Sequence, residues 1–185
     1  MDFAPTSVSG VWLLQQQRHA DDRGWFARTW DEAELRERGL EARVVQCSAS
    51  FNHRRGTLRG LHYQAPPFAE AKVVRCTRGR LFDVAVDLRP DSSTFRAWVG
   101  VELTPENGRS LYIPRGCAHG FLTLSDDTEV AYQITPEYSP DHARGVRWDD
   151  PLLAIAWPEP VATIAPRDRD YPDVQLSALE ELRGI

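Results

Sequence analysis

Two of the five histidines differ from the others in their neighbours. His62 lies in RGLHYQ and His119 in PRGCAHGF, so each has a glycine and an apolar residue close by. These neighbours favour an imidazole on or beside a strand, directed into a protected interior. An imidazole there is either a hydrogen-bonded core group or a general base that works near neutral pH. The other histidines lie among polar or charged residues: His19, His53 and His142.

A metal site would need more ligands than these two histidines supply. Many jelly-roll barrels hold a metal through two histidines one residue apart, a glutamate shortly after and a third histidine on a later strand. Here Tyr63 and Gln64 follow His62, and glycine and phenylalanine follow His119. Two isolated histidines do not complete a shell of three or four ligands. We therefore expect no metal and no other cofactor.

A phenol and a carboxylate are the other candidates for proton chemistry. Tyr132 lies in the apolar run VAYQIT, and Tyr138 follows in EYSP. A phenol can return a proton to a carbanion, although a tyrosine on a barrel strand can equally be a core residue. Asp168 and Asp170 lie in APRDRDYPD. A carboxylate behind a histidine fixes its tautomer, and the alternative is a solvated acidic tail.

Cations are supplied almost entirely by arginine. Of the 22 lysine and arginine residues, only Lys72 is a lysine. A lone ammonium is either a chance survivor or a compact, movable charge that the chemistry requires. No glycine-rich phosphate loop is present, so any phosphate site has to be built from side chains. The arginines that could build it include Arg23, Arg59, Arg75 and Arg78.

The middle of the chain predicts the β-strands that would position these groups. Short runs rich in β-branched and aromatic residues alternate with turn signals, which is typical of a sandwich or barrel. The runs cover residues 72–76, 81–88, 98–103, 110–114, 119–124 and 129–135. A helix is predicted over 31–39, and a short C-terminal helix over 177–183 with Ser177 as its cap.

Length and composition limit the class of protein. The 185 residues suggest one domain, and the net charge of −5 disfavours a nucleic-acid binder. No apolar run approaches the ~18 residues of a membrane span, and the first ten residues lack the pattern of a signal peptide. Three widely spaced cysteines are expected to be small core residues with reduced thiols. We expect a cytoplasmic protein that binds neither nucleic acid nor membrane.

Long ordered motifs resemble one known family. They are DDRGWF (21–26), RGLHYQAPPFAEAKVVRCTRGRLFDVAVDLRPDSSTF (59–95), LYIPRGCAHGFLTLSDDTEVAYQ (111–133) and GVRWDDPLLAIAWP (145–158). Together they are similar to the dTDP-4-dehydrorhamnose 3,5-epimerase family, and the resemblance extends over nearly the whole chain. It implies a metal-free cupin jelly-roll barrel with a few short flanking helices, one epimerase domain over residues 1–185, and a homodimer.

The implied reaction inverts carbons beside the C4 ketone of a nucleotide-linked 4-keto-6-deoxyhexose. On this resemblance His62 is the base, Asp168 orients it, and Tyr132 is the acid. Lys72 falls where the family has its lysine, and a cation there can stabilise charge that develops on the ketone oxygen. Deoxysugar biosynthesis is the implied setting, and a nucleotide-diphosphate sugar is the implied substrate.

The resemblance also implies substrate-binding positions. Arg23 and Arg59 match the arginines that contact the diphosphate, and His119 matches the family's second histidine. Gln46 and Ser48 occupy the family's Gln-Asp-Asn segment, here Gln-Cys-Ser. Tyr138 completes the candidate binding residues.

Four positions depart from the family pattern, and one of them is Cys47, where the family has an aspartate. Arg28 replaces a glutamate and Ser48 an asparagine, both of which lie near the nucleobase in the family, and Glu70 replaces a frequent glutamine. Arg28 can only donate hydrogen bonds, so it cannot accept the N3–H of thymine. Either the base is bound differently, with cytidine as one outcome, or Arg28 turns to solvent or pairs with Glu70 while thymidine binds through backbone groups and Gln46.

Two other functions stay open at this stage. One is a mono-epimerase that acts at C3 or C5 alone, on an antibiotic-type or non-dTDP sugar nucleotide. The other is a cupin that binds a nucleotide sugar without turning it over. The presence together of His62, Asp168, Tyr132 and Lys72 argues against the second.

Overall fold

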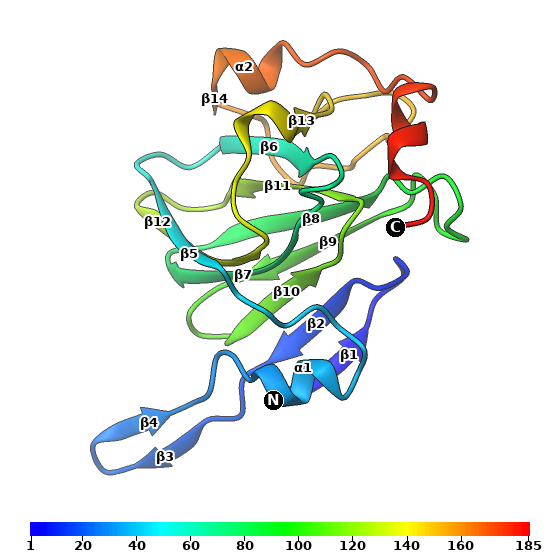
Figure 1. Cartoon of the computed structure of the whole chain (residues 1–185). Coiled ribbons are helices and arrows are strands. Elements are labelled where there is room, and N and C mark those ends of the chain that lie inside the picture. Colours follow the sequence, from blue (N-terminus) through cyan, green and yellow to red (C-terminus); the bar gives the residue numbers. More distant parts are fainter.

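The computed structural model describes the whole chain, residues 1–185, and contains two large β-sheets facing a shared interior (Figure 1). The first sheet has the strand order β1 (Asp2–Pro5), β2 (Trp12–Gln15), β10 (Arg109–Ile113), β7 (Ala71–Arg78), β12 (Thr128–Thr135), β5 (Gln46–Asn52). The second has the order β13 (Ala143–Gly145), β6 (Thr57–Gln64), β11 (Cys117–Thr123), β8 (Leu81–Asp87), β9 (Trp98–Leu103). Neighbours pair antiparallel, except that β14 (Thr163–Ile164) runs parallel to β6. The architecture is the expected all-β jelly roll.

The six strands predicted from the sequence correspond to β7 through β12. The near-continuous apolar run of β8 has a physical cause, because both of its faces are covered. Leu81 and Ala85 pack between the two sheets, whereas Val84 and Val86 pack under the C-terminal segment with Leu179. Strands of this kind show apolar residues on both faces in place of a clean alternation.

Four short helical segments flank the barrel: α1 (Glu32–Arg36), η1 (Pro140–His142), α2 (Pro166–Arg169) and η2 (Ala178–Leu182), of which η1 and η2 are 3-10 helices. Asp31 caps α1 by accepting hydrogen bonds from the amides of Ala33 and Glu34, as helix starts favour. The C-terminal helix is present, but the expected cap is wrong. Ser177 makes no side-chain capping bond, because its backbone is already helical there.

A small hairpin projects away from the barrel at the lower left of Figure 1. It consists of β3 (His19–Asp21) and β4 (Gly24–Phe26), which pair only with each other. Trp25 and Phe26 remain exposed on it, at 55% and 67% of their accessible surface. The Arg18 guanidinium lies 4.3 Å from the Trp25 ring centroid, and the two neighbouring aromatic rings give the hairpin an exposed apolar surface.

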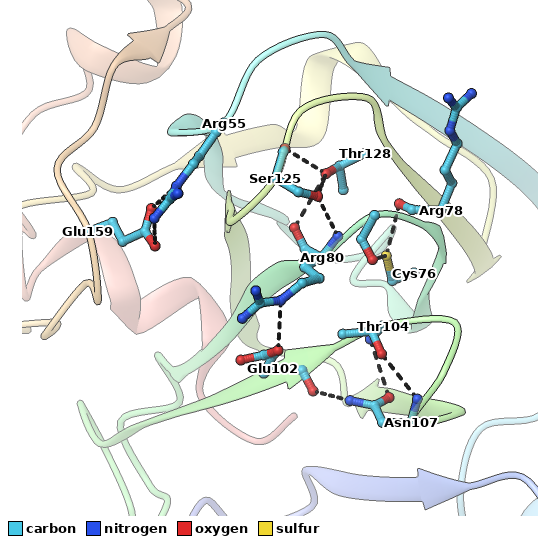
Figure 2. A network of polar contacts seen from close by, with 11 residues as sticks. Arg55, Cys76, Arg78, Arg80, Glu102, Thr104, Asn107, Ser125, Thr128 and Glu159 are labelled. Carbon is cyan, nitrogen blue, oxygen red and sulfur yellow. Dashed lines mark hydrogen bonds and ion pairs between the residues drawn. The ribbon is translucent and has the colours of Figure 1, made fainter.

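Polar side chains tie together the turns at one end of the barrel (Figure 2). The Arg80 Nε donates to Glu102 over 3.1 Å, while the Arg80 amide donates to Ser125 Oγ. The Ser125 and Thr128 hydroxyls lie 3.1 Å apart. In the register of β7 with β12, this end is opposite the end at which Lys72 lies beside Ile134. These bonds therefore hold the turns without entering the cavity described below.

No helix of the structure has the length and apolar character to cross a membrane. The cysteine expectation is correct for two residues and wrong for one. Cys76 and Cys117 are buried between the sheets, whereas Cys47 is exposed.

Candidate active site

A cavity of about 310 Å³ opens between the two sheets. Its walls come from β5, β6, β7, β11, β12, β13, the segment after β12, and α2. The lining includes Ser48, Ser50, Arg59, His62, Lys72, His119, Tyr132, Tyr138, Arg144 and Arg167. Residues from 48 to 167 in the sequence therefore meet in one place, and most of the groups that the sequence marked for chemistry are among them.

The His62 imidazole is held by a carboxylate behind it. Its Nε2 lies 2.8 Å from Asp168 Oδ1, and the Gly60 amide donates to Asp168 Oδ2 over 3.1 Å. The Asp168 side chain is 8% exposed and that of His62 is 39% exposed, so the ring faces the cavity while its partner is covered. With Nε2 donating to the carboxylate, Nδ1 remains free to accept a proton.

The charge of Asp168 is maintained despite its burial. Burial by itself raises the pKa of this carboxyl, but the hydrogen bond and charge of His62 and the Gly60 amide outweigh it. The pKa of Asp168 is therefore lowered from its ordinary value, and the group is ionised at neutral pH. An ionised carboxylate stabilises the imidazolium that forms when His62 takes a proton.

Gly60 is needed for this arrangement. Its φ is +115°, and an added Cβ would lie 2.6 Å from both the Gly120 Cα and the His119 carbonyl oxygen. Side chains are strained at that φ, and the strands β6 and β11 leave no space for one. The glycine therefore lets β6 approach β11 while its amide is directed at Asp168.

A tyrosine that the sequence analysis did not select forms a wall beside His62. The rings of Tyr171 and His62 meet edge to face with centroids 6.1 Å apart, and Arg167 Nε donates to the Tyr171 hydroxyl over 2.9 Å. The ring packs so closely on Gly145 that a Cβ there would lie 2.2 Å from it. Gly145 therefore provides the space in which Tyr171 stands.

His119 has a carboxylate partner of its own. Its Nε2 lies 2.7 Å from Asp83 Oδ1, and Asp83 is fully buried within β8. The second oxygen, Oδ2, has no hydrogen-bond partner. The carboxylate fixes the orientation of the ring, so His119 Nδ1 is the nitrogen available to a bound molecule.

Tyr132 stands on the sheet opposite His62. Its hydroxyl is 3.0 Å from Ser50 Oγ, and its ring meets that of His119 edge to face at 6.3 Å. Burial raises the pKa of Tyr132 to about 12. The phenol therefore keeps its proton at neutral pH and can donate it across the cavity.

Lys72 lies on the same sheet as Tyr132. On β7 it pairs with Ile134 of β12, which is two residues after Tyr132. Its Nζ donates to Glu70 Oε1 in a contact that is almost sealed from solvent. The expected alternative pairing of Glu70 with Arg28 is wrong, because Arg28 pairs with Asp31 over 2.8 Å. The Lys72 ammonium faces a cavity that contains no other lysine.

The structure brings together eight of the eleven predicted site residues. His62, Lys72, His119, Tyr132, Ser48, Arg59 and Tyr138 line the cavity, and Asp168 supports His62 from behind. Gln46 is adjacent but does not line the cavity, since its Oε1 accepts from the Tyr138 amide over 2.8 Å. Arg23 and Arg28 do not reach this cavity. Arg23 lies on the projecting hairpin, 90% exposed and paired with Asp21.

Sequence reasoning missed several residues of the site. Asp83 had a visible signal, because a carboxylate in the middle of the apolar run LFDVAV needs a buried partner. Ser50, Arg144 and Arg167 had none, because isolated serines and arginines in polar segments are common on any surface. Their place in the cavity depends on how the chain folds, not on a local pattern.

No three His, Cys, Asp or Glu side chains gather in the structure in a way that could hold a metal ion. Each cavity histidine has its Nε2 occupied by a carboxylate, with a single nitrogen left over.

Both the sequence and the fold of this chain match known proteins. The family model described as dTDP-4-dehydrorhamnose 3,5-epimerase matches residues 5–175. A dTDP-4-dehydrorhamnose 3,5-epimerase of Sinorhizobium fredii is 46% identical over 159 residues, which are 86% of this chain and 82% of that protein. The rmlC epimerase of Mycobacterium tuberculosis superposes with a TM-score of 0.92 at 35% identity, covering 97% of this chain and 92% of the other.

A second structural relative has a narrower activity. It is a 3'-monoepimerase from Streptomyces bikiniensis, solved in complex with dTDP-quinovose, with a TM-score of 0.85 and 35% identity over 96% of this chain and 89% of that one. The match of the family model over nearly the whole length, with relatives of this identity and coverage, establishes the assignment. The chain belongs to the dTDP-4-dehydrorhamnose 3,5-epimerase family.

Proposed function

We propose that this protein inverts C3, C5 or both in a dTDP-linked 4-keto-6-deoxyhexose, through His62 as base and Tyr132 as acid. One observation supports this above the others. The His62 imidazole comes from one sheet, with its carboxylate on α2 behind it, and the protonated phenol comes from the other sheet; the imidazole and the phenol face the same cavity. Inversion requires a proton to leave one face of the sugar ring and another to arrive at the opposite face, so the two groups have to be separated in this way.

The first step breaks the C–H bond beside the ketone. His62 Nδ1 takes the proton, and the electron pair moves into an enolate with its negative charge on O4. The Lys72 ammonium stabilises that charge, because a cation held in a cavity sheltered from water interacts more strongly than one in solution. Asp168 stabilises the imidazolium that His62 becomes.

The second step returns a proton to the carbon on the other face. The Tyr132 hydroxyl donates it, the C–H bond re-forms with inverted configuration, and the ketone is restored. The phenolate then regains a proton from solvent, and His62 releases the one that it took. No atom is gained or lost, so the reaction is an isomerisation.

The cations of the cavity suit the diphosphate. Arg59 is held by Asn52, whose Oδ1 accepts from Arg59 Nε over 2.7 Å, and Arg144 and Arg167 lie on the neighbouring walls. Guanidinium groups bind phosphate oxygens through paired hydrogen bonds. Ser48 and Tyr138 lie in the same cavity and complete the proposed binding residues, and His119 presents Nδ1 to the sugar.

The test is NMR of a dTDP-linked 4-keto-6-deoxyhexose incubated with the protein in D₂O. Deuterium at C3 and C5 together with inversion at both supports the double epimerisation. Deuterium and inversion at one carbon alone would identify a mono-epimerase, as the similarity to the 3'-monoepimerase allows. A protein that binds dTDP but catalyses no exchange would refute the proposed activity.

We further propose that no metal or organic cofactor takes part, that the protein is cytoplasmic, and that Lys72 supplies the positive charge a metal would otherwise provide. Three free thiols fit a reducing compartment. Stoichiometric iron, zinc or manganese in the purified active protein, measured by elemental analysis, would contradict the metal-free reaction.

A homodimer would explain the position of Arg23. The residue is assigned to the diphosphate by the resemblance, yet it lies on a hairpin that projects away from its own cavity. The exposed Trp25 and Phe26 on that hairpin give it an apolar surface for a second copy. We propose that the hairpin of one copy brings Arg23 to the cavity of the other, with Arg28 close behind it.

Mixing two inactive variants tests this. Arg23→Ala lacks the arginine and His62→Ala lacks the base, so a hybrid dimer has one site with both groups intact. Regained activity in the mixture, together with a dimer in sedimentation, supports the exchange. A monomer in sedimentation and no regained activity would refute it.

A further inference from the structure

Glu70 is the only acidic residue among the 15 that line the cavity. The other charged lining residues are cations, namely Arg59 of β6, Lys72 of β7, Arg144 of β13 and Arg167 of α2. A negative charge is unfavourable in a site for a diphosphate, because it repels the substrate. Its presence there therefore needs a reason within the cavity.

The carboxylate is directed at the single lysine of the chain. Glu70 Oε1 accepts from Lys72 Nζ, and the two side chains are 9% and 8% exposed. Removing an ammonium from water favours its neutral form, unless an opposite charge lies beside it. Glu70 supplies that charge. It directly precedes β7 and is two positions before Lys72 in the chain.

Glu70 is the only carboxylate within hydrogen-bond or ion-pair distance of Lys72. Across the strand pairs, Lys72 is beside Ile134 of β12 and Ile113 of β10, both neutral. The remaining titratable groups of the cavity are two imidazoles and three phenols, those of His62, His119, Tyr63, Tyr132 and Tyr138. Asp83 and Asp168 are each engaged by a histidine on the opposite sheet. The guanidinium groups of the cavity have the same charge as the ammonium and cannot pair with it.

We propose that Glu70 is a positioning residue that keeps the Lys72 amine protonated and directed into the cavity, so that it meets the enolate oxygen as a cation. The inference rests on the proposed function, in which charge develops at O4. A neutral amine at this place would stabilise the enolate far less, because only the charged form provides a strong electrostatic interaction.

The single lysine allows a direct measurement. An amine-selective reagent such as acetic anhydride reacts with the unprotonated amine, so its rate at each pH reports the state of that amine. Only Lys72 and the α-amine of Met1 can react, and mass spectrometry of the peptides separates the two. Met1, which pairs with Glu34, serves as the internal reference.

We expect the labelling profile of Lys72 in Glu70→Gln to move to lower pH by about one to three units relative to the wild type, since a direct opposite charge has effects of this size. The alkaline limb of kcat/KM should move in the same direction. Glu102→Gln is the matched control. It removes the same charge from a surface pair with Arg80 and should leave the Lys72 profile in place (Figure 2).

A Lys72 profile that is the same in Glu70→Gln and in the wild type would overturn the inference. The inference would also be overturned if Lys72 of the wild type already reacted fully at neutral pH. That measurement does not depend on whether a variant folds. Glu70→Asp keeps the charge and should stay closer to the wild-type profile than Glu70→Gln does. The labelling is done without substrate, so its result is independent of the proposed reaction. The proposed reaction is refuted only if the wild type shows no exchange in D₂O.

Discussion

His62 and His119 lie directly opposite each other in the pairing of β6 with β11, and each has its Nε2 against a different buried aspartate. The two imidazoles therefore enter the cavity side by side with their Nδ1 atoms free. Only His62 has substantial exposure, and only its aspartate lies on a segment outside the two sheets, in α2. This difference fits the proposed roles, in which His62 exchanges protons and His119 is a fixed binding group.

His62→Ala should abolish both solvent exchange and epimerisation, because neither can begin without a base. A positioned base contributes about 10²–10⁴-fold to a rate. Deuterium incorporation followed by NMR is the measurement. His53→Ala is the control, since His53 is exposed on the turn after β5 and does not line the active cavity. Near-normal exchange in His62→Ala would make His62 a structural residue.

Asp168→Asn should lower kcat by at least ~10²-fold while the fold is kept, because an amide can hold the wrong tautomer of His62. The lowered pKa of Asp168 also sets an acid limit. A depressed pKa means that the ionised Asp168 carboxylate stabilises the fold above the ordinary carboxyl range, and that this stabilisation is lost as pH falls through the lowered value.

The pH dependence can be measured as the difference in unfolding free energy between wild type and Asp168→Asn, which should shrink on acidification below about pH 4. Asp170→Asn is the control, because Asp170 is exposed and pairs with Arg169. If Asp170→Asn slows the reaction and Asp168→Asn does not, the partner of His62 has been assigned wrongly.

Tyr132→Phe should separate exchange from inversion. His62 could still remove a proton and return a deuteron to the same face, so deuterium should enter at one carbon at least without a change of configuration. Tyr112→Phe is a close control. Burial raises the pKa of Tyr112 to about 12 as well, and its hydroxyl accepts from the Glu41 amide away from the active cavity. Equal loss of exchange and inversion in Tyr132→Phe would show that Tyr132 shapes the cavity.

Gly145→Ala should impair catalysis through Tyr171. The added Cβ would lie 2.2 Å from the Tyr171 ring, so the ring has to move from its place against His62. Overpacking of this kind costs about 1–3 kcal/mol of stability. The double variant Gly145→Ala with Tyr171→Ala should recover the melting temperature but not the full kcat. An unchanged kcat in the single variant would argue against Tyr171 as a wall for the base.

Asp87→Asn should destabilise the barrel by about 3 kcal/mol, because it leaves a partly buried Arg89 without its counter-charge. Burial raises the pKa of Asp87, but hydrogen bonds from Arg89, Ser92 and Thr94 outweigh it and the net pKa is lowered. The loss should therefore be largest above about pH 4 and decline in acid. Urea unfolding at several pH values measures it, and equal losses at pH 3 and pH 7 would contradict the account.

The strands of the barrel were predictable where continuous apolar runs mark them; β6 (TLRGLHYQ) was not predicted although most of it is buried, because its apolar residues are interrupted by polar ones and a glycine. The runs that became β7 to β12 have apolar residues on one or both faces, so their period is visible. β5 has the sequence QCSASFN and lies at the edge of its sheet, mostly exposed, which leaves no such period. Its Ser48 and Ser50 therefore entered the site without a strand to predict their direction.

The site was predictable from the sequence only with the family resemblance, and Asp168 shows why. By itself the segment APRDRDYPD is typical of a solvated tail, yet Asp168 is buried against β6. Nothing local distinguishes it from Asp170, because burial here is decided by the docking of α2 on a strand far away in the sequence. Arg23 and Arg28 show the opposite case. The resemblance marks them as binding residues, but neither lines the cavity of its own chain. That residues 1–185 form a single domain stays a prediction.

His62 and Asp168 are 106 positions apart, and the later of the two arrives on α2, behind the last strand of the barrel. During synthesis the ribosome therefore releases every strand of the second sheet before the partner of the base has emerged. A nascent chain can therefore contain all of these strands and still lack the carboxylate that orients the His62 imidazole. A chain that ends before residue 168 would therefore leave the His62 imidazole without its carboxylate partner, whichever strands it had already formed.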